Sequence, residues 1–180
     1  MNDLIEVICS RHSVRAFSKH AIDKGSVIKI VLAGLAAPSS NAVRPWEIIV
    51  IDNPDLLKRL STTHIYSSFV ASASQCFVVC GDHTRTKYWV EDCSAVVENM
   101  LLAAHALGLG ACWVAVHRQK HGHENAESYV RSVLQIPDTL SVLAMVPVGK
   151  LLSATPRVSR KSNSDRVYLN NYGNRGFDTY

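Results

Sequence analysis

The stretch from Glu91 to Val116, EDCSAVVENMLLAAHALGLGACWVAV, constrains the fold most. Its first part is rich in Ala, Leu, Met and Glu, which favour a helix. Apolar side chains surround much of that helix, at Val96, Val97, Met100, Leu101, Ala104 and Leu107. A helix that is apolar this far round needs cover on two or more sides. We expect the cover to come from its own domain or from a second subunit.

Gly108 and Gly110 are expected to end this helix, as glycine commonly does. The apolar run Ala111–Val116 follows directly and predicts a buried strand. Two buried elements joined by a glycine turn could form the floor of a site for a flat ligand. They could equally be an ordinary core helix and core strand, and this stretch alone favours that reading.

The chain of 180 residues is long enough for one domain with a substantial core. It is 47% hydrophobic and 19% charged, which is typical of a globular protein. No apolar run reaches the roughly 20 residues that cross a bilayer, and the first ten residues do not resemble a signal peptide. We therefore expect a cytoplasmic protein that does not enter a membrane.

The net charge of +4 is spread along the chain, apart from one basic cluster. That cluster consists of Arg157, Arg160, Lys161 and Arg166. A nucleic-acid binder would usually carry a denser basic stripe, so a small anionic ligand suits this charge better than nucleic acid.

The five cysteines are odd in number and form no CxxC pair. All five lie in apolar or helical surroundings. They are expected to be small buried hydrophobic residues in a reducing compartment, without disulfides.

Hydrophobic periodicity predicts helices and strands in alternation. Helices are expected at residues 2–9, 22–37, 54–60, 91–107 and 124–134, with Asn2 as a possible first cap and Pro38 ending the second. Strands are expected at residues 46–51, 76–81, 111–116 and 140–148. Residues 62–74 show no assignable pattern. The alternation suggests one sheet with helices on both faces.

Two short segments raise the question of a ligand. Ser10–Arg15 contains two arginines and two serines, which suit a phosphate, although an isolated basic turn is more often solvated. His117–His123 contains three histidines, but no acid or cysteine completes a metal-ligand set at familiar spacing. We expect a solvated loop there and no metal.

Residues 150–180 are rich in Arg, Ser and Asn, with scattered tyrosines. They are either a disordered tail or an arm that crosses onto a partner. Val167, Tyr168, Leu169 and Tyr172 favour an arm, since they give it apolar surface to bury.

Taken in order, these segments resemble the nitroreductase family of flavin enzymes over nearly the whole chain. The resemblance lies in Arg11–Arg15, in Ala37–Asn41 followed by Pro45-Trp46, in the stretch from Asp92 to Trp113, and in Leu134–Pro137 with Pro147–Gly149. Each motif is weak alone, but together in this order they are specific.

The resemblance implies a single α+β domain over residues 1–180, with a mixed, mainly antiparallel sheet flanked by helices. It also implies an intertwined homodimer, with the central helices at the interface and residues 150–180 as an arm on the partner. FMN would lie at that interface.

The resemblance also implies which residues contact FMN. The turn formed by Arg11, His12, Ser13 and Arg15 would hold the phosphate and ribityl chain. Pro38, Ser39, Ser40 and Asn41 would approach the flavin from the partner, and Trp113, Val114 and Ala115 would lie along the isoalloxazine with a backbone N–H near N5. Arg160 or Lys161, in the same cluster as Arg157, would add a phosphate contact.

The implied activity is transfer of hydride from NAD(P)H, through bound FMN, to a nitroaromatic or quinone-type acceptor by a ping-pong mechanism, with no catalytic side chain. Two departures from the family affect the substrate: Ala115-Val116 replaces the acid–glycine pair often found beside N5, and the chain lacks a lid insertion. Two alternatives stay open. One is a same-fold flavoprotein doing ring reduction or dehalogenation, and the other is a non-enzymatic flavin-binding dimer.

Overall fold

A computed structural model of the chain describes residues 3–153 and 166–175. Along these residues the elements are α1 (Leu4–Ser10), α2 (Lys24–Leu35), η1 (Ser40–Ala42), β1 (Trp46–Ile51), α3 (Pro54–Leu60), η2 (Ser68–Ser72), β2 (Gln75–Asp82), α4 (Trp89–Ala106), β3 (Leu109–Ala111), β4 (Val114–Ala115), β5 (Lys120–His121), β6 (Glu124–Asn125), α5 (Ala126–Leu134) and β7 (Leu140–Lys150).

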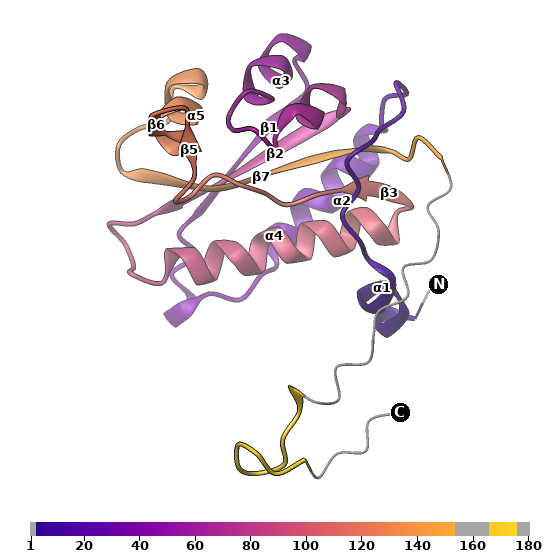
Figure 1. Cartoon of the computed structure of the whole chain (residues 1–180), viewed down its shortest axis with the longest axis vertical. Coiled ribbons are helices and arrows are strands. Elements are labelled where there is room, and N and C mark those ends of the chain that lie inside the picture. The colour runs from indigo at the N-terminus through magenta and orange to yellow at the C-terminus, as the bar shows by residue number, and fades with distance from the viewer. Residues whose placement is uncertain (1–2, 154–165, 176–180) are drawn as a thin grey trace.

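The central sheet is antiparallel at every pairing between described strands. Its order is β1-β2-β7-β3, and β4 also pairs with β7. Along β2, Phe77 and Val79 join the apolar core on one face, while Val78 and Cys80 join the core on the other. Figure 1 shows α4 and α2 on the first face and α3 and α5 on the second. The predicted α+β fold, with a mainly antiparallel sheet and helices on both faces, is confirmed.

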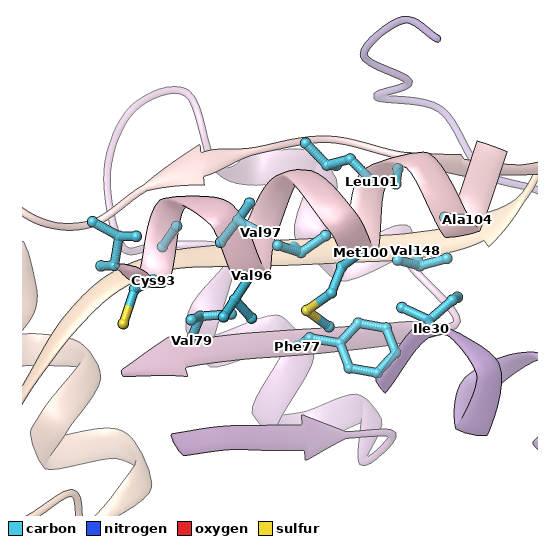
Figure 2. Close-up of a cluster of buried hydrophobic side chains, with 14 of the residues drawn as sticks. Ile30, Phe77, Val79, Cys93, Val96, Val97, Met100, Leu101, Ala104 and Val148 are labelled. Atoms are coloured by element: carbon cyan, nitrogen blue, oxygen red, sulfur yellow. The ribbon is translucent and has the colours of Figure 1, made fainter. Parts of the chain in front are cut away.

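Helix α4 lies along the sheet and is covered largely within its own chain. Val96 and Met100 are fully buried in one cluster with Phe77 of β2 and Ile30 of α2 (Figure 2). A Cβ at Gly34 of α2 would lie 2.9 Å from Cγ of Met100, so the two helices approach closely. Of the two sources of cover expected from the sequence, the chain's own domain supplies most of it, through α2 and the sheet.

The two glycines after α4 have different roles. Gly108 has a φ of +72° just past the helix end, so it terminates the helix as predicted. Gly110 instead lies inside β3, where an added Cβ would come within 2.7 Å of Cγ1 of Val14. Its role is to let another segment approach the strand, and the prediction that it ends the helix is wrong.

The predicted strand 111–116 is split in two. Leu109–Ala111 forms β3 and Val114–Ala115 forms β4, and both pair with β7. Cys112 and Trp113 lie between them. The apolar run is therefore continuous in sequence but interrupted as a strand, and its two parts pair with different positions of β7.

Several local predictions need correction. Asp3 caps α1 by accepting a 3.2 Å hydrogen bond from the Ile5 N–H, while Asn2 lies outside the described residues. Cys9 is exposed, contrary to the expectation that all five cysteines are buried. Within the segment predicted as a solvated histidine loop, Lys120–His121 forms β5, which pairs with β6 (Glu124–Asn125) at the start of the predicted helix 124–134.

Part of the C-terminal segment is described. Residues 154–165 and 176–180, which include Arg157, Arg160 and Lys161, lie outside the described residues. Within 166–175, the Tyr168 and Tyr172 rings lie 4.6 Å apart, and Tyr172 is 91% exposed. Among the described helices, none is both long enough and apolar enough to span a bilayer.

Candidate functional site

The turn after α1 is fixed onto the sheet through its middle residue. The Val14 N–H donates to the Ala111 carbonyl oxygen at 2.9 Å, and the Val14 side chain is buried against Gly110. Arg15 and Ser13 on either side of Val14 are exposed. A buried anchor thus holds polar and cationic groups beside the β3–β4 bend.

A cavity of about 170 Å³ opens at this bend. Four of the predicted site residues line it together: Arg15, Trp113, Val114 and Ala115. Its other lining residues were not predicted from the sequence; they are His64, Tyr66, Phe69, Cys112 and Gln119. The cavity therefore combines one guanidinium with an apolar floor and an aromatic wall.

The wall comes from the segment that sequence patterning left unassigned. His64 Nδ1 accepts a hydrogen bond from the Tyr66 N–H at 3.1 Å, and His64 Nε2 lies 3.0 Å from the Ala115 carbonyl oxygen. This segment has neither helical nor strand periodicity, since serine and threonine hydroxyls hold its backbone. In the sequence, a histidine and a tyrosine within a polar stretch were the features that could have indicated a site here.

The other predicted turn residues lie at the C-terminal end of α4. Ser10 Oγ is 2.9 Å from Nε2 of His105, and Arg11 Nε is 3.6 Å from a Glu98 carboxylate oxygen. The His12 ring packs edge-on against His105 at 5.8 Å, and its buried Nε2 has no hydrogen-bond partner among the described residues. Burial, and then the nearby His12 and Arg11, lower the pKa of His105 below 6.5.

The Pro38–Asn41 segment belongs to a strained loop at the other end of α4. Asn41, Ala42 and Arg44 all have φ between +48° and +55°, which is unfavourable for residues with a Cβ. The loop is held by the Ser40 N–H, which donates to Oδ1 of Asp92 at 2.8 Å. Arg85 also donates to the Val43 carbonyl oxygen at 2.7 Å. Strain of this kind tends to mark functional segments.

The two groups of predicted residues are therefore separated within one chain. The Arg11–Arg15 turn meets α4 near His105, and the Pro38–Asn41 segment meets it at Asp92. Thirteen helical residues at 1.5 Å each place these two points about 20 Å apart. One chain gathers Arg15 with Trp113–Ala115, but it does not bring Ser39, Ser40 or Asn41 to the same cavity.

The cysteine beside the cavity is not set up as a nucleophile. Cys112 is buried, and burial raises the pKa of its thiol. Burial likewise raises the pKa values of Cys76, Cys80 and Cys93 to about 12. A thiol rather than a thiolate is then the form present near neutral pH, and a thiol is a poor nucleophile.

Two of the three histidines of residues 117–123 contact other side chains. The His117 ring packs edge-on against Trp89 at 4.9 Å, and its Nδ1 lies 3.6 Å from a Glu127 carboxylate oxygen. His121 stacks on Tyr129 at 3.9 Å. Across the described part of the chain, no group of three or more His, Cys, Asp or Glu side chains is placed to hold a metal ion.

Comparison with known proteins identifies the family. The model of the nitroreductase family matches residues 8–75 and 63–150, which together span the cavity, the strained loop and the sheet. The chain belongs to the nitroreductase family. The predicted resemblance is thus confirmed.

Nitroreductase-family relatives match this chain over most of its length. A candidate NADH dehydrogenase/NAD(P)H nitroreductase from Archaeoglobus fulgidus is 35% identical over 153 residues, covering 83% of this chain and 86% of the relative. The solved FMN-dependent nitroreductase from Clostridium difficile is 30% identical, with a TM-score of 0.90, over 93% of this chain and 99% of the other. The NADPH:FMN oxidoreductase from Vibrio harveyi, solved with NAD+, is 25% identical with a TM-score of 0.80, over 95% and 78% of the two chains.

In this fold, segments that are far apart in the sequence pair with the same strand, β7. This strand pairs with β2 on one side and with β3 and β4 on the other, so it carries the cavity floor. The Leu134–Pro137 motif ends α5 through Gln135, whose φ of +56° is left-handed, and the chain then enters β7.

Proposed function

We propose that this nitroreductase-family chain is an FMN-dependent oxidoreductase that transfers hydride from NAD(P)H to nitroaromatic or quinone-type acceptors. The observation that supports this most is the cavity that joins Arg15 to the backbone of Trp113, Val114 and Ala115. The Clostridium difficile relative is named FMN-dependent, and the Vibrio harveyi relative is an NADPH:FMN oxidoreductase.

The groups around the cavity fit a flavin mononucleotide chemically. Guanidinium forks and hydroxyls suit a phosphate, and Arg11, Ser13 and Arg15 supply them on one turn. The apolar floor and the Tyr66 and Phe69 rings suit a flat aromatic ring. His12 Nδ1 lies 3.1 Å from the Ser10 carbonyl oxygen and donates to it, so the buried Nε2 of the neutral ring would accept a hydrogen bond from a ligand.

We assign phosphate and ribityl contacts to Arg11, His12, Ser13 and Arg15, and ring contacts to Trp113, Val114 and Ala115. Arg160 and Lys161 remain proposed further phosphate ligands outside the described residues. A cavity of about 170 Å³ is smaller than the roughly 300–1,000 Å³ typical of such sites. The rest of the enclosure must come from elsewhere, and we assign it to a second copy of the chain.

A two-fold homodimer would complete the site with Pro38, Ser39, Ser40 and Asn41 of the other copy. These residues lie at one end of α4 and the Arg11–Arg15 turn lies at the other. If the α4 helices of two copies lay antiparallel, the Pro38–Asn41 segment of each copy would lie near the Arg11–Arg15 turn of the other. The dimer would then contain two equivalent sites. We further propose that the arm, residues 150–180, crosses onto the partner.

Exposed apolar surface on α1 and α2 supports such a dimer. Six large side chains there are between 41% and 66% exposed. They are Leu4, Ile5, Ile8, Ile28, Leu32 and Leu35. Exposed apolar side chains grouped on a helix in this way suit an interaction site. The interface therefore rests on α1 and α2 as well as on the exposed edge of α4.

When bound, FMN supplies the two-electron chemistry, in which hydride passes from a reduced nicotinamide to an acceptor. The residues of this chain orient the ring, neutralise the phosphate charge and exclude water from the floor. No described side chain at the cavity is needed as a nucleophile or proton donor. Because a single cavity serves both donor and acceptor, we propose ping-pong kinetics in which each substrate competes with the other.

Anaerobic stopped-flow absorbance tests this proposal. The purified protein should be yellow, NADH or NADPH should bleach the bound flavin, and a nitroaromatic or quinone should restore the colour. A colourless protein that does not take up FMN would refute flavin binding. If bleaching is no faster than for free FMN, ring reduction or dehalogenation with other donors becomes the better reading.

A further inference from the structure

His64 connects the aromatic wall of the cavity to its floor. Its Nδ1 is 3.1 Å from the Tyr66 backbone nitrogen, which can only donate. Nδ1 is therefore the unprotonated nitrogen, and Nε2 carries the proton that is donated to the Ala115 carbonyl oxygen at 3.0 Å. One neutral imidazole thus makes two bonds of opposite sense, to two different parts of the cavity.

Residues 61–67, the segment that contains His64, are held by internal hydrogen bonds and carry two exposed side chains. Ser67 is fully buried, and its hydroxyl bonds to the Ser61 carbonyl oxygen, the His64 carbonyl oxygen and the His64 N–H at 2.8, 2.7 and 3.0 Å. Ile65 and Tyr66 project from this knot and are 84% and 75% exposed. The hydrogen bonds of Ser67 and His64 thus fix the backbone from which these two exposed side chains project.

A second histidine holds the same segment from the other side. His121 Nδ1 lies 2.9 Å from the Thr62 carbonyl oxygen and 3.2 Å from the Thr63 carbonyl oxygen. His121 stacks on Tyr129 and does not line the cavity. It is therefore a matched control for His64, because it makes a similar bond to the same segment without touching the site.

We propose that His64 is a positioning residue of the flavin site, which fixes residues 61–67 against β4 so that Tyr66 forms a wall for the flavin ring. The inference rests on the proposed function, since it assigns the cavity to FMN. It adds a residue outside the motifs that carry the family resemblance. His64 acts through Tyr66 and Ala115 and takes no part in electron transfer.

Three substitutions separate the two bonds of His64. His64→Leu removes both, His64→Gln keeps a donor long enough to approach Ala115, and His64→Asn keeps an acceptor close to the Tyr66 N–H. The measurement is the Kd for FMN added to the apoprotein, by quenching of flavin fluorescence, together with the melting temperature of the apoprotein. His121→Leu is the control.

We expect His64→Leu to raise the FMN Kd about tenfold, the effect of losing one or two net hydrogen bonds. His64→Gln should recover part of that loss, because it restores the bond to the floor. His121→Leu should lower the melting temperature comparably and change the Kd by less than about twofold. If His64→Leu and His121→Leu raise the Kd equally, His64 has only a structural role and the inference is overturned.

Nitrogen-15 NMR of the apoprotein tests the same inference without flavin. The His64 ring should show the Nε2–H tautomer, and exchange of the Tyr66 amide should be slow in the wild type and faster in His64→Leu. A His64 ring in the Nδ1–H form would overturn the inference. Failure of the wild-type protein to bind FMN would instead refute the proposed function. The tautomer of the His64 ring is measured in the apoprotein, so that result does not depend on flavin binding.

Discussion

The Ser40 N–H donates a 2.8 Å hydrogen bond to Oδ1 of Asp92, a side chain that is only 5% exposed. This bond ties a loop containing three left-handed residues to the start of the longest helix. Oδ2 of Asp92 is also buried and has no partner among the described residues. Through Oδ1, this buried carboxylate therefore helps to hold the loop.

We expect Asp92→Ala to lower the free energy of unfolding by about 1.5–3 kcal/mol, the scale of a hydrogen bond to a charged group. Urea denaturation measures the change. Ser94→Ala is the control on the same helix, because the hydroxyl of Ser94 donates to the Val90 carbonyl oxygen within α4. It should cost no more than about 1 kcal/mol. Equal losses in the two variants would contradict the role given to Asp92.

Gly110→Ala should weaken FMN binding through the turn that packs on it. The new Cβ would lie 2.7 Å from Cγ1 of Val14, so the turn or the strand must shift, at a cost of about 1–3 kcal/mol in stability. Gly108→Ala is strained by its φ of +72° but meets nothing within 4 Å. It should cost about 1 kcal/mol and leave the FMN Kd unchanged. Fluorescence titration and urea denaturation of both variants check this.

Arg11→Ala should weaken FMN binding by about 1.5–3 kcal/mol, as expected for a charged hydrogen bond to phosphate. Arg11 also pairs with Glu98 at 3.6 Å, so a loss could arise from that pair instead. Glu98→Gln removes the pair and keeps the guanidinium, and it should not reduce FMN affinity. Full flavin occupancy of Arg11→Ala at low added FMN would contradict the phosphate assignment.

Leu32→Glu should dissociate the proposed dimer. Leu32 is 59% exposed on α2, and a carboxylate cannot be buried in an apolar interface without a partner. Sedimentation velocity at micromolar protein should show a dimer for the wild type and a monomer for the variant. Lys58→Glu, on α3 across the sheet, should remain dimeric. A wild type that is a stable folded monomer would refute the dimer.

Stability should fall as the pH drops through about 6.5, partly because of His105. The folded chain lowers the pKa of His105 by burial and by the nearby His12 and Arg11, so the unfolded chain binds this proton more readily. The resulting penalty is absent well above pH 6.5 and grows below it, until the folded group also titrates. His105→Gln should lose less stability than the wild type between about pH 7.5 and 5 in urea denaturation. An equal loss would show that other groups dominate.

Local sequence determined much of the scaffold. The continuous apolar run Cys76–Gly81 correctly predicted the buried strand β2, and the glycine after α4 ended that helix. These features depend on neighbours within a few residues, where propensity and periodicity act. The order of the family motifs likewise pointed to the nitroreductase family, and from it to Arg15 and Trp113–Ala115, which the structure brings to one cavity.

Only the tertiary structure decided the contacts between distant segments. The covering of α4 by α2, the role of Gly110 against Val14 and the split of residues 111–116 each depend on what packs opposite, which no local pattern records. The same holds for His64, since its segment is shaped by hydroxyl-to-backbone bonds and by a carbonyl 51 positions away. Sequence periodicity indicates which side chains of a segment face the core and which face solvent. Hydrogen bonds between distant residues depend instead on where the fold places both partners.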